Sequence, residues 1–355
     1  MDMLQKTIKG IQQPDKKKYE EALIRLSEQA RPAGSLGILE NLSARLAGIA
    51  GTLDVKIKKK VIVTCAGDHG VVAEGVTLFP QEVTSQMVYN FVDGGASINV
   101  LARHAGARVV VADLGVNHDF DLAMPIFHKK VRKAAYNIAK GPAMTMDEAV
   151  RSLENGISII DELLLKDRID IIGTGDMGIG NTTPSSAIIA VLSGIAVEEL
   201  TGRGAGLSDE AFQNKINVIK KAIETNRPDP NDALDVLAKV GGFEIGGIAG
   251  LVLGGAAHGI PVVCDGLIST AGALIACGLA PAAKEYLFAS HSSVEAGHKF
   301  MLDHLGLVPL LDLKLRLGEG TGAALAMELL DASTRILAEI KTFAEVNIID
   351  AQKNV

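Results

Sequence analysis

Short apolar runs alternate along the chain with longer segments of helical spacing. Four of these runs are rich in β-branched residues, and Gly or Asp follows each of them closely. They cover residues 61–65, 109–112, 169–172 and 261–264. Such runs are typical of strands that are buried on both faces of a parallel sheet. Helical spacing occupies the intervening residues 83–92, 146–165 and 185–192. The alternation predicts an α/β fold with an open, doubly wound, mostly parallel sheet.

Both ends of the chain show helical patterns outside this alternation. Residues 1–50 carry apolar positions at helical spacing on either side of a turn-rich segment at 31–37 (RPAGSLG). Residues 321–343 carry one long, mostly apolar pattern, which could pack with the N-terminal helices or with a second subunit. The break at 226–231 (NRPDPN) is expected to be a surface turn between two helices rather than a domain boundary.

Composition and charge argue against several classes of function. The net charge of -7 gives no electrostatic reason to expect a nucleic-acid partner, and the basic run at 56–60 is expected to be the solvated start of a strand. Cys65, Cys264 and Cys277 lie far apart in apolar stretches, which favours buried free thiols over disulfides or a zinc site. The sequence shows no signal-like N-terminus and no stretch of about 18 uncharged apolar residues. We therefore expect a soluble, cytoplasmic protein that binds neither nucleic acid nor membrane.

Glycines and acidic residues follow three of the expected strands, at 67–70 (GDHG), 173–176 (GTGD) and 265–266 (DG). In open α/β sheets, ligands bind beyond the carboxyl ends of the strands, so we expect the site to be built from these loops. Asp68 and His69 could ligate a metal or act in acid–base catalysis. Lone Asp and His residues after a strand more often brace loops, so no metal site is predicted.

The segment 173–184 (GTGDMGIGNTTP) follows a strand and precedes a helix, which is a common context for anion binding. Its glycines would let backbone N–H groups converge on a phosphate. Thr183 would cap the helix, and Pro184 would take the first helical position. The segment therefore predicts a phosphate cradle.

The first part of this segment, residues 173–178, also matches the dinucleotide fingerprint GxGxxG, with Glu198 or Glu199 about 20 residues further on. In that fingerprint the helix begins within the motif, whereas here the loop is longer. Neither glutamate ends a clear strand. A nicotinamide-dinucleotide dehydrogenase is therefore kept as a less favoured alternative.

Glu319 stands between two glycines in the segment 317–322 (LGEGTG). The glycines would let the backbone approach a ligand closely and exclude water. A carboxylate in such a place can have a raised pKa and accept a proton near neutral pH. Equally, Glu319 could be a first-turn acid of the helix that starts at Thr321, favoured by the helix dipole. Spacing alone does not decide between these interpretations.

Two further polar elements are ambiguous. Residues 290–293 (SHSS) offer hydroxyls and an imidazole for a phosphate or a ribose, or else form an N-cap cluster. Lys215 stands in a helix of mixed character, where lysines are usually solvated.

Five motifs together are more informative than any one of them. They lie at 32–37 (PAGSLG), 66–71 (AGDHGV), 177–183 (MGIGNTT), 202–207 (GRGAGL) and 317–322 (LGEGTG). With them the chain resembles, nearly end to end, the nicotinate-nucleotide:dimethylbenzimidazole phosphoribosyltransferase family. The resemblance implies a doubly wound parallel sheet, a smaller domain of helices from both chain ends, and a homodimer. On this basis we divide the chain into N-terminal helices of the small domain at 1–55, an α/β nucleotide- and base-binding domain at 56–305, and a catalytic loop with C-terminal helices at 306–355.

The resemblance also implies an activity and residue roles. Family members transfer phosphoribose from nicotinate mononucleotide to the lower-ligand base of a cobamide, and the transfer requires no metal or redox cofactor. Glu319 matches the general base, which removes the azole proton while the other ring nitrogen attacks C1′ of the ribose, and Asp176 is expected to be a second catalytic residue. The nucleotide and its phosphate would be held by Gly178, Ile179, Gly180, Asn181, Thr182, Lys215 and Ser293. The base pocket would be lined by Leu78, Gln86 and Leu317.

Two departures from the family pattern bear on function. Asp176 stands where Glu is expected, which keeps the charge but shortens its reach, so its contact could become water-mediated. Leu78 stands where a small polar residue is expected, which adds apolar volume and removes a hydroxyl. Transfer to phenol or p-cresol, by relatives described as pairs of homologous subunits, is therefore the leading alternative. A non-catalytic partner subunit is a third hypothesis, against which the retained Glu319 argues.

Overall fold

The computed structural model describes residues 2–204 and 206–349. Residue 205, within the motif at 202–207, lies outside the described residues. So do Met1 and residues 350–355, the end of the predicted C-terminal part.

The centre of the fold is a six-stranded sheet in which all neighbouring strands are parallel, in the order β3-β2-β1-β4-β5-β6. The strands are β1 Lys60–Gly67, β2 Ala107–Gly115, β3 Phe127–His128, β4 Ile171–Met177, β5 Val262–Cys264 and β6 Leu287–Ala289. All four predicted strands are present, and the short edge strands β3 and β6 are additional. The strand order reverses direction at β1 and β4, as in doubly wound folds. The predicted fold class is confirmed.

Helices cover both faces of this sheet. The α-helices are α1 Met3–Gly10, α2 Lys16–Glu28, α3 Ile38–Ala50, α4 Val83–Asp93, α5 Ser97–His104, α6 Met146–Lys166, α7 Thr182–Ser193, α8 Val197–Leu200, α9 Asp209–Asn226, α10 Ala233–Val240, α11 Phe243–Ala257, α12 Leu267–Leu279, α13 Ala296–Leu305, α14 Thr321–Glu339 and α15 Phe343–Val346. Two 3-10 helices, η1 Gly70–Glu74 and η2 Pro281–Tyr286, complete the elements.

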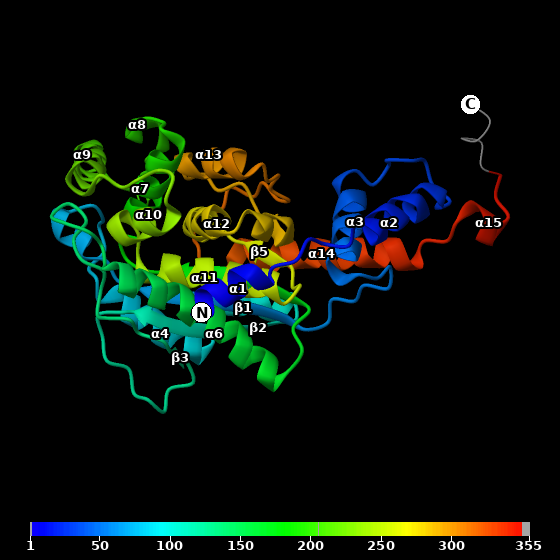
Figure 1. The fold of residues 1–355 in the computed structure, drawn as a ribbon, viewed down its shortest axis with the longest axis horizontal. Helices are drawn as coiled ribbons and strands as arrows, with labels where there is room; N and C mark the ends of the chain where they lie inside the picture. The colour runs from blue at the N-terminus through cyan, green and yellow to red at the C-terminus, as the bar shows by residue number, and fades with distance from the viewer. Residues whose placement is uncertain (1, 205, 350–355) are drawn as a thin grey trace.

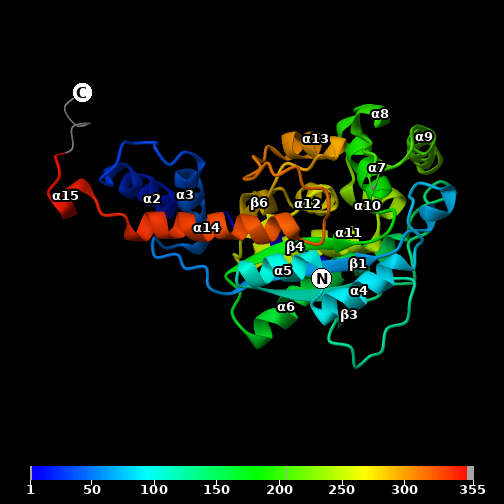
Figure 2. The same cartoon turned by 180° about the vertical axis from the view of Figure 1, so that it is seen from behind.

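Alternate side chains of β1 enter two different hydrophobic cores, because successive residues of a strand point to opposite faces. Val61, Val63 and Cys65 join the core formed with α6, α11 and α12. Ile62 and Ala66 join a second core formed with α4, α5 and α14, the helices that lie in front of the sheet in Figure 2. Both faces of the sheet are therefore buried, which explains the unbroken apolar runs in the sequence.

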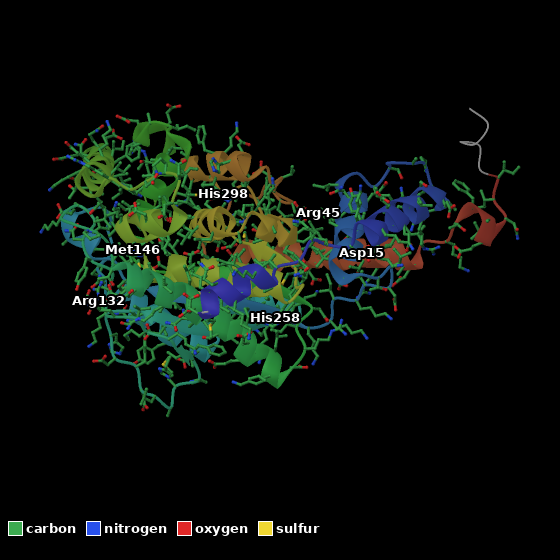
Figure 3. All side chains as sticks on the ribbon, in the orientation of Figure 1. Asp15, Arg45, Arg132, Met146, His258 and His298 are labelled. Carbon is green, nitrogen blue, oxygen red and sulfur yellow. The ribbon has the colours of Figure 1, made fainter. Side chains whose placement is uncertain are left out.

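A small bundle of α2, α3 and the second half of α14 lies to one side of the sheet (Figure 1). Its core is small and consists of Ala22, Leu26, Ala44, Ala47 and Leu337. Arg45 of α3, labelled in Figure 3, connects this bundle to the sheet. It donates a hydrogen bond to the carbonyl of Leu287 in β6 at 2.7 Å and stacks over the ring of Phe288. Both chain ends thus contribute to the bundle.

Three local features differ from the predictions. Helix α1 packs against α6 and α11 rather than joining the bundle, and the side chain of Leu4 is buried there. Lys60 is buried and paired with Glu328 and Asp331 of α14, so the basic run at 56–60 is not solvated throughout. Helix α14 ends at Glu339, because the backbone becomes extended at Ile340, the C-cap residue.

The three cysteines are free thiols, as predicted, although Cys277 is less buried than expected. Cys65 and Cys264 are buried, Cys277 is half-buried, and all three are free. Within residues 2–204 and 206–349, none of the helices is long and apolar enough to cross a membrane.

Candidate active site

A cavity of about 340 Å³ lies beyond the carboxyl ends of β4 and β5. Every predicted site residue except Gln86 lines it. These residues are Leu78, Asp176, Gly178, Ile179, Gly180, Asn181, Thr182, Lys215, Ser293, Leu317 and Glu319. The cavity therefore brings together segments that lie more than two hundred residues apart in the sequence.

Strand β4 runs five residues further than the predicted apolar run and reaches Met177. Gly173 and Gly175 are therefore strand residues, not loop residues as we had expected. A Cβ atom at Gly175 would lie only 2.3 Å from the carbonyl oxygen of Glu319. Gly175 thus lets the segment before α14 cross closely over the strand, and Gly173 leaves room for Ala323 and Met327 of α14, so neither glycine forms part of a phosphate loop.

The predicted phosphate cradle consists of the short loop from Gly178 to Asn181 and the start of α7. Gly180 has a φ of 89°, a left-handed conformation that favours glycine. The N–H of Ile179 donates to the hydroxyl of Thr84 at 3.1 Å, which fixes the loop against α4. Helix α7 begins at Thr182, so its N-terminus faces this loop.

The cap of α7 differs from the prediction. Asn181 is the N-cap residue, and Thr183 and Pro184 are the second and third residues of the helix. The hydroxyl of Thr183 is buried and has no hydrogen-bond partner among the described residues. Residue preferences alone predict Thr183 as the cap, whereas the tight turn at Gly180 lets the helix begin at Thr182.

The side chain of Lys215, in α9, reaches the cradle at the start of α7. Its side chain is buried, and Nζ donates to the hydroxyl of Thr182 at 2.8 Å and to the carbonyl of Gly202 at 3.2 Å. Burial lowers the pKa of Lys215 to about 8, and the charge of Glu295 partly opposes this. The expectation of a solvated lysine is wrong, since this cation lies at the wall of the cavity.

The segment 290–293 contributes Ser293 and His291 to the cavity wall. The backbone N–H of Ser293 donates to Nδ1 of His298 at 3.0 Å, and Nε2 of His298 lies 2.9 Å from the hydroxyl of Thr270. Burial lowers the pKa of His298 to about 3, so this imidazole, labelled in Figure 3, is neutral and can accept from Ser293.

Glu319 lies just before α14 with its side chain buried. Its Oε2 accepts a hydrogen bond at 3.1 Å from the N–H of Ile98, in the first turn of α5. Burial raises the pKa of Glu319, and this hydrogen bond opposes the rise. The carboxylate is thus tied to the start of a neighbouring helix, not to that of its own, so the interpretation as a first-turn acid of α14 does not describe it.

Asp176 is buried at the end of β4, next to the acidic loop, Gly318–Gly320, which carries Glu319. Its backbone carbonyl accepts from the N–H of Glu319 at 3.2 Å, and its Oδ2 accepts from the side chain of Asn181 at 3.1 Å. Burial raises the pKa of Asp176 well above its usual range, and the charges of Asp265 and Glu244 raise it further. Asp176 therefore connects the acidic loop to the phosphate cradle.

An apolar wall faces these polar groups. It contains Val76, Leu78, Phe79, Val83, Met87 and Leu317. Leu78 and Leu317 are 60% and 55% exposed, so both lie at the mouth of the cavity. Gln86 is exposed and does not reach the cavity. Val83 and Met87, one turn apart on α4, present the face that does.

Asp68 and His69 brace neighbouring segments next to the cavity, as predicted. The Oδ2 of Asp68 accepts from the N–H of Asn117 at 2.8 Å, and Nε2 of His69 lies 2.7 Å from Oε1 of the buried Glu244. The residues that the structure describes contain no group of three or more His, Cys, Asp or Glu that could hold a metal ion.

Comparison with known proteins decides the family. A family model described as "Phosphoribosyltransferase" matches residues 11–348. Nicotinate-nucleotide–dimethylbenzimidazole phosphoribosyltransferases from Geobacter sp. (strain M21) and Geobacter sulfurreducens are each 54% identical, and the alignments cover 98–99% of this chain and 99% of each relative. The chain belongs to this phosphoribosyltransferase family. The crystal structure of CobT from Thermus thermophilus is similar, with a TM-score of 0.91 and 43% identity over 94% of this chain and 99% of that one.

Membership in the phosphoribosyltransferase family confirms the resemblance. The structure also removes the support for a dinucleotide fingerprint. Gly173 and Gly175 lie within β4, and Glu198 lies in the short helix α8, paired with Lys220 on the surface, rather than at the end of a strand. Nothing in the comparisons favours a dehydrogenase.

Sequence reasoning assigned no role to several polar residues in or next to the cavity, among them Arg203, Glu295, Arg316 and Asp265. Arg203 and Arg316 line the cavity, and the guanidinium of Arg316 donates to the carbonyl of Gly204 at 3.1 Å. Asp265 accepts three hydrogen bonds from the start of α14. Asp265 directly follows a predicted strand. That position indicates a loop of the site, but it does not indicate a role for this residue.

Proposed function

We propose that this protein transfers a 5-phosphoribosyl group from nicotinate mononucleotide to the lower-ligand base of a cobamide, 5,6-dimethylbenzimidazole or a related base. The products are the α-riboside 5′-phosphate and nicotinate. One observation carries the proposal. A buried glutamate with a raised pKa, Glu319, lines the same cavity as a phosphate cradle that includes the buried cation Lys215.

The cradle supports binding of the nucleotide phosphate. A helix N-terminus and glycine-rich backbone favour an anion, and Lys215 adds a point charge that is already oriented by Thr182 and Gly202. Ser293 would add a hydroxyl from the other side of the cavity. Holding the phosphate in this way fixes the position of the ribose relative to Glu319.

Glu319 supports the chemical step. One ring nitrogen of the base forms a bond to C1′ as the bond from C1′ to the pyridinium nitrogen breaks, and the electron pair of that bond neutralises the leaving nicotinate ring. The proton on the other ring nitrogen passes to the carboxylate of Glu319. Attack from the face opposite the leaving group inverts the anomer from β to α. Because the pyridinium is already an activated leaving group, positioning and proton removal are the main needs.

The raised pKa of Glu319 suits this role. A general base works best when its pKa approaches the working pH. Burial raises the pKa of this carboxyl group, while the N–H of Ile98 stabilises the ionised form. Asp176, at the end of β4, supports the acidic loop through its backbone carbonyl.

Product analysis tests this function directly. The purified chain is incubated with nicotinate mononucleotide and a mixture of dimethylbenzimidazole, adenine, phenol and p-cresol, and the ribosylated products are identified by mass spectrometry. We expect the α-riboside phosphate of a benzimidazole-type base. A phenolic product would instead assign the base class of the phenol-activating relatives, and no product from the chain alone would favour a non-catalytic subunit.

We also propose that the protein works in the cytoplasm as a dimer, with an identical or a homologous chain. Leu23, Ile24 and Ile38 of the small bundle are 39%, 59% and 43% exposed, and apolar side chains on so small a bundle favour burial against another chain. Light scattering coupled to size-exclusion chromatography would test this. A mass near 37.2 kDa, that of one chain, would contradict it.

A further inference from the structure

The backbone at Glu319 has an unusual conformation. Glu319 has a φ of 64°, and its neighbours Gly318 and Gly320 have φ values of 86° and 98°. A residue with a long side chain rarely adopts a left-handed conformation, and it does so only where the surroundings hold it. Helix α14 then begins directly after Gly320, which has no side chain to accept the first N–H groups of the helix.

Asp265 supplies the missing acceptors from another part of the chain. It follows β5 directly and is 1% exposed. Its Oδ2 accepts from the N–H of Gly320 at 3.1 Å, and its Oδ1 accepts from Gly322 at 2.7 Å and from Ala323 at 3.1 Å. One carboxylate therefore caps α14 in place of the N-cap residue, immediately after Glu319.

The backbone around Asp265 is itself held in place. Its carbonyl accepts from the hydroxyl of Ser290 at 2.9 Å. On the other side of the acidic loop, the hydroxyl of Thr64 donates to the carbonyl of Glu319 at 3.0 Å. With the backbone bond to Asp176 in β4 and the carboxylate of Asp265 after β5, residues from three strand segments thus hold the loop.

We propose that Asp265 is a positioning residue for the transfer reaction, which fixes the carboxylate of Glu319 by holding the start of α14. The inference rests on the proposed function, because it concerns the role of Glu319 as the base. Asp265 makes no contact with the phosphate cradle in the described hydrogen bonds. Its loss should therefore slow the chemical step and leave nucleotide binding intact.

The variant Asp265→Asn tests this inference. It keeps the shape and one acceptor oxygen, but it places an NH₂ group against a backbone N–H. We expect kcat to fall about 30-fold and the KM for nicotinate mononucleotide to change less than about threefold, since small misplacements of a reacting group cost rate rather than binding.

Asp113→Asn is a matched control. Asp113 is 1% exposed at the end of β2, accepts from the N–H of Val116 at 2.9 Å, and pairs with Lys130. It does not line the cavity. This variant should lose thermal stability as Asp265→Asn does, while its kcat stays within about twofold of that of the wild type.

A double variant separates positioning from general damage. If Asp265 acts through Glu319, adding Asp265→Asn to Glu319→Gln slows turnover no further. The inference would be overturned if the two substitutions lowered kcat by multiplied factors, or if Asp265→Asn had the same kcat as Asp113→Asn. Turnover by the wild type would still support the proposed function in either case. Absence of wild-type transfer would refute both. Should Asp265→Asn fail to fold, Asp265→Ser, which retains one small acceptor, enters the same comparison.

Discussion

The phosphate cradle and the acidic loop line one cavity but are built in different ways. The cradle is mostly one continuous stretch, Gly178 to Thr182, and its geometry follows from a glycine and a helix start. The acidic loop at Gly318–Gly320 depends on groups supplied by Thr64 within β1, Asp176 near the end of β4 and Asp265 just after β5. The local sequence therefore determines the shape of the predicted phosphate cradle, whereas the tertiary fold determines the position of Glu319.

The largest expected effect separates the two parts most clearly. Glu319→Gln removes the proton acceptor but keeps the shape of the side chain. We expect kcat to fall by about 10²-fold or more, the range for loss of a general base, while the affinity for nicotinate mononucleotide stays nearly unchanged. Steady-state kinetics and calorimetric titration measure the two quantities. Unchanged turnover would refute the assignment of the base.

Gly175→Ala should damage the acidic loop without touching its chemistry. The added Cβ would meet the carbonyl oxygen of Glu319 at 2.3 Å, so the loop must shift. We expect a loss of about 1–3 kcal/mol in the free energy of unfolding from overpacking. We also expect kcat to fall about 30-fold, because the base is displaced. Gly141→Ala is the control, because a Cβ there has open space. Equal kinetics for the two variants would contradict the close crossing.

Lys215→Met should damage the cradle instead. It keeps the apolar stem and removes the charge, so we expect KM for the nucleotide to rise about 10- to 30-fold, the worth of a charged hydrogen bond, with a smaller change in kcat. A larger effect on kcat than on KM would contradict the assignment of nucleotide binding to the cradle and of the chemical step to the acidic loop.

The pKa of Lys215 adds a pH test to the same residue. Since burial lowers this pKa from 10.5 to about 8, the free protein loses the cation as pH rises through about 8. Nucleotide affinity should fall there in the wild type and not in Lys215→Met. The sign for stability is opposite: the unfolded chain binds the proton more tightly, so this residue makes the fold more stable as pH rises from about 8 to 10.5.

Leu78→Ser should have the smallest effect. Leu78 is 60% exposed at the mouth of the cavity, so only part of its side chain can contact a base. We expect the ratio of kcat/KM for dimethylbenzimidazole over p-cresol to rise about three- to tenfold, less than a fully buried methylene would give. Competition assays with both bases measure this ratio. An unchanged ratio would show that Leu78 does not select the base.

The fold was largely predictable because both faces of the sheet are buried, and unbroken β-branched runs marked four strands. The extension of β4 was not predictable from such runs. Its residues Gly173, Thr174 and Gly175 resemble a loop in composition, and the two glycines are explained only by the close packing of α14 and of the Glu319 segment on the strand. Similarly, α1 has helical spacing, but nothing in its sequence indicated that it packs on α6 and α11.

For the site, glycine spacing indicated the cradle, and family resemblance was needed for the rest. Lys215 looks like any surface lysine in its sequence, since its burial results from the packing of α9 against α7. The role of Asp265 depends on hydrogen bonds to residues 55 to 58 positions away, which no local pattern reports. Gln86 was placed by resemblance alone, and here Val83 and Met87 take that side of the cavity.

Helix α14 joins the acidic loop to the small bundle, and this limits how the protein can be rebuilt. Its first residues bind Asp265, its middle pairs with Lys60 of β1, and Leu337 near its end fills the core between α2 and α3. The bundle is therefore not an exchangeable module. A bundle grafted from a relative would also change the helix that holds Glu319 in place. The junction of a chimaera should therefore lie before Gly318 rather than within α14.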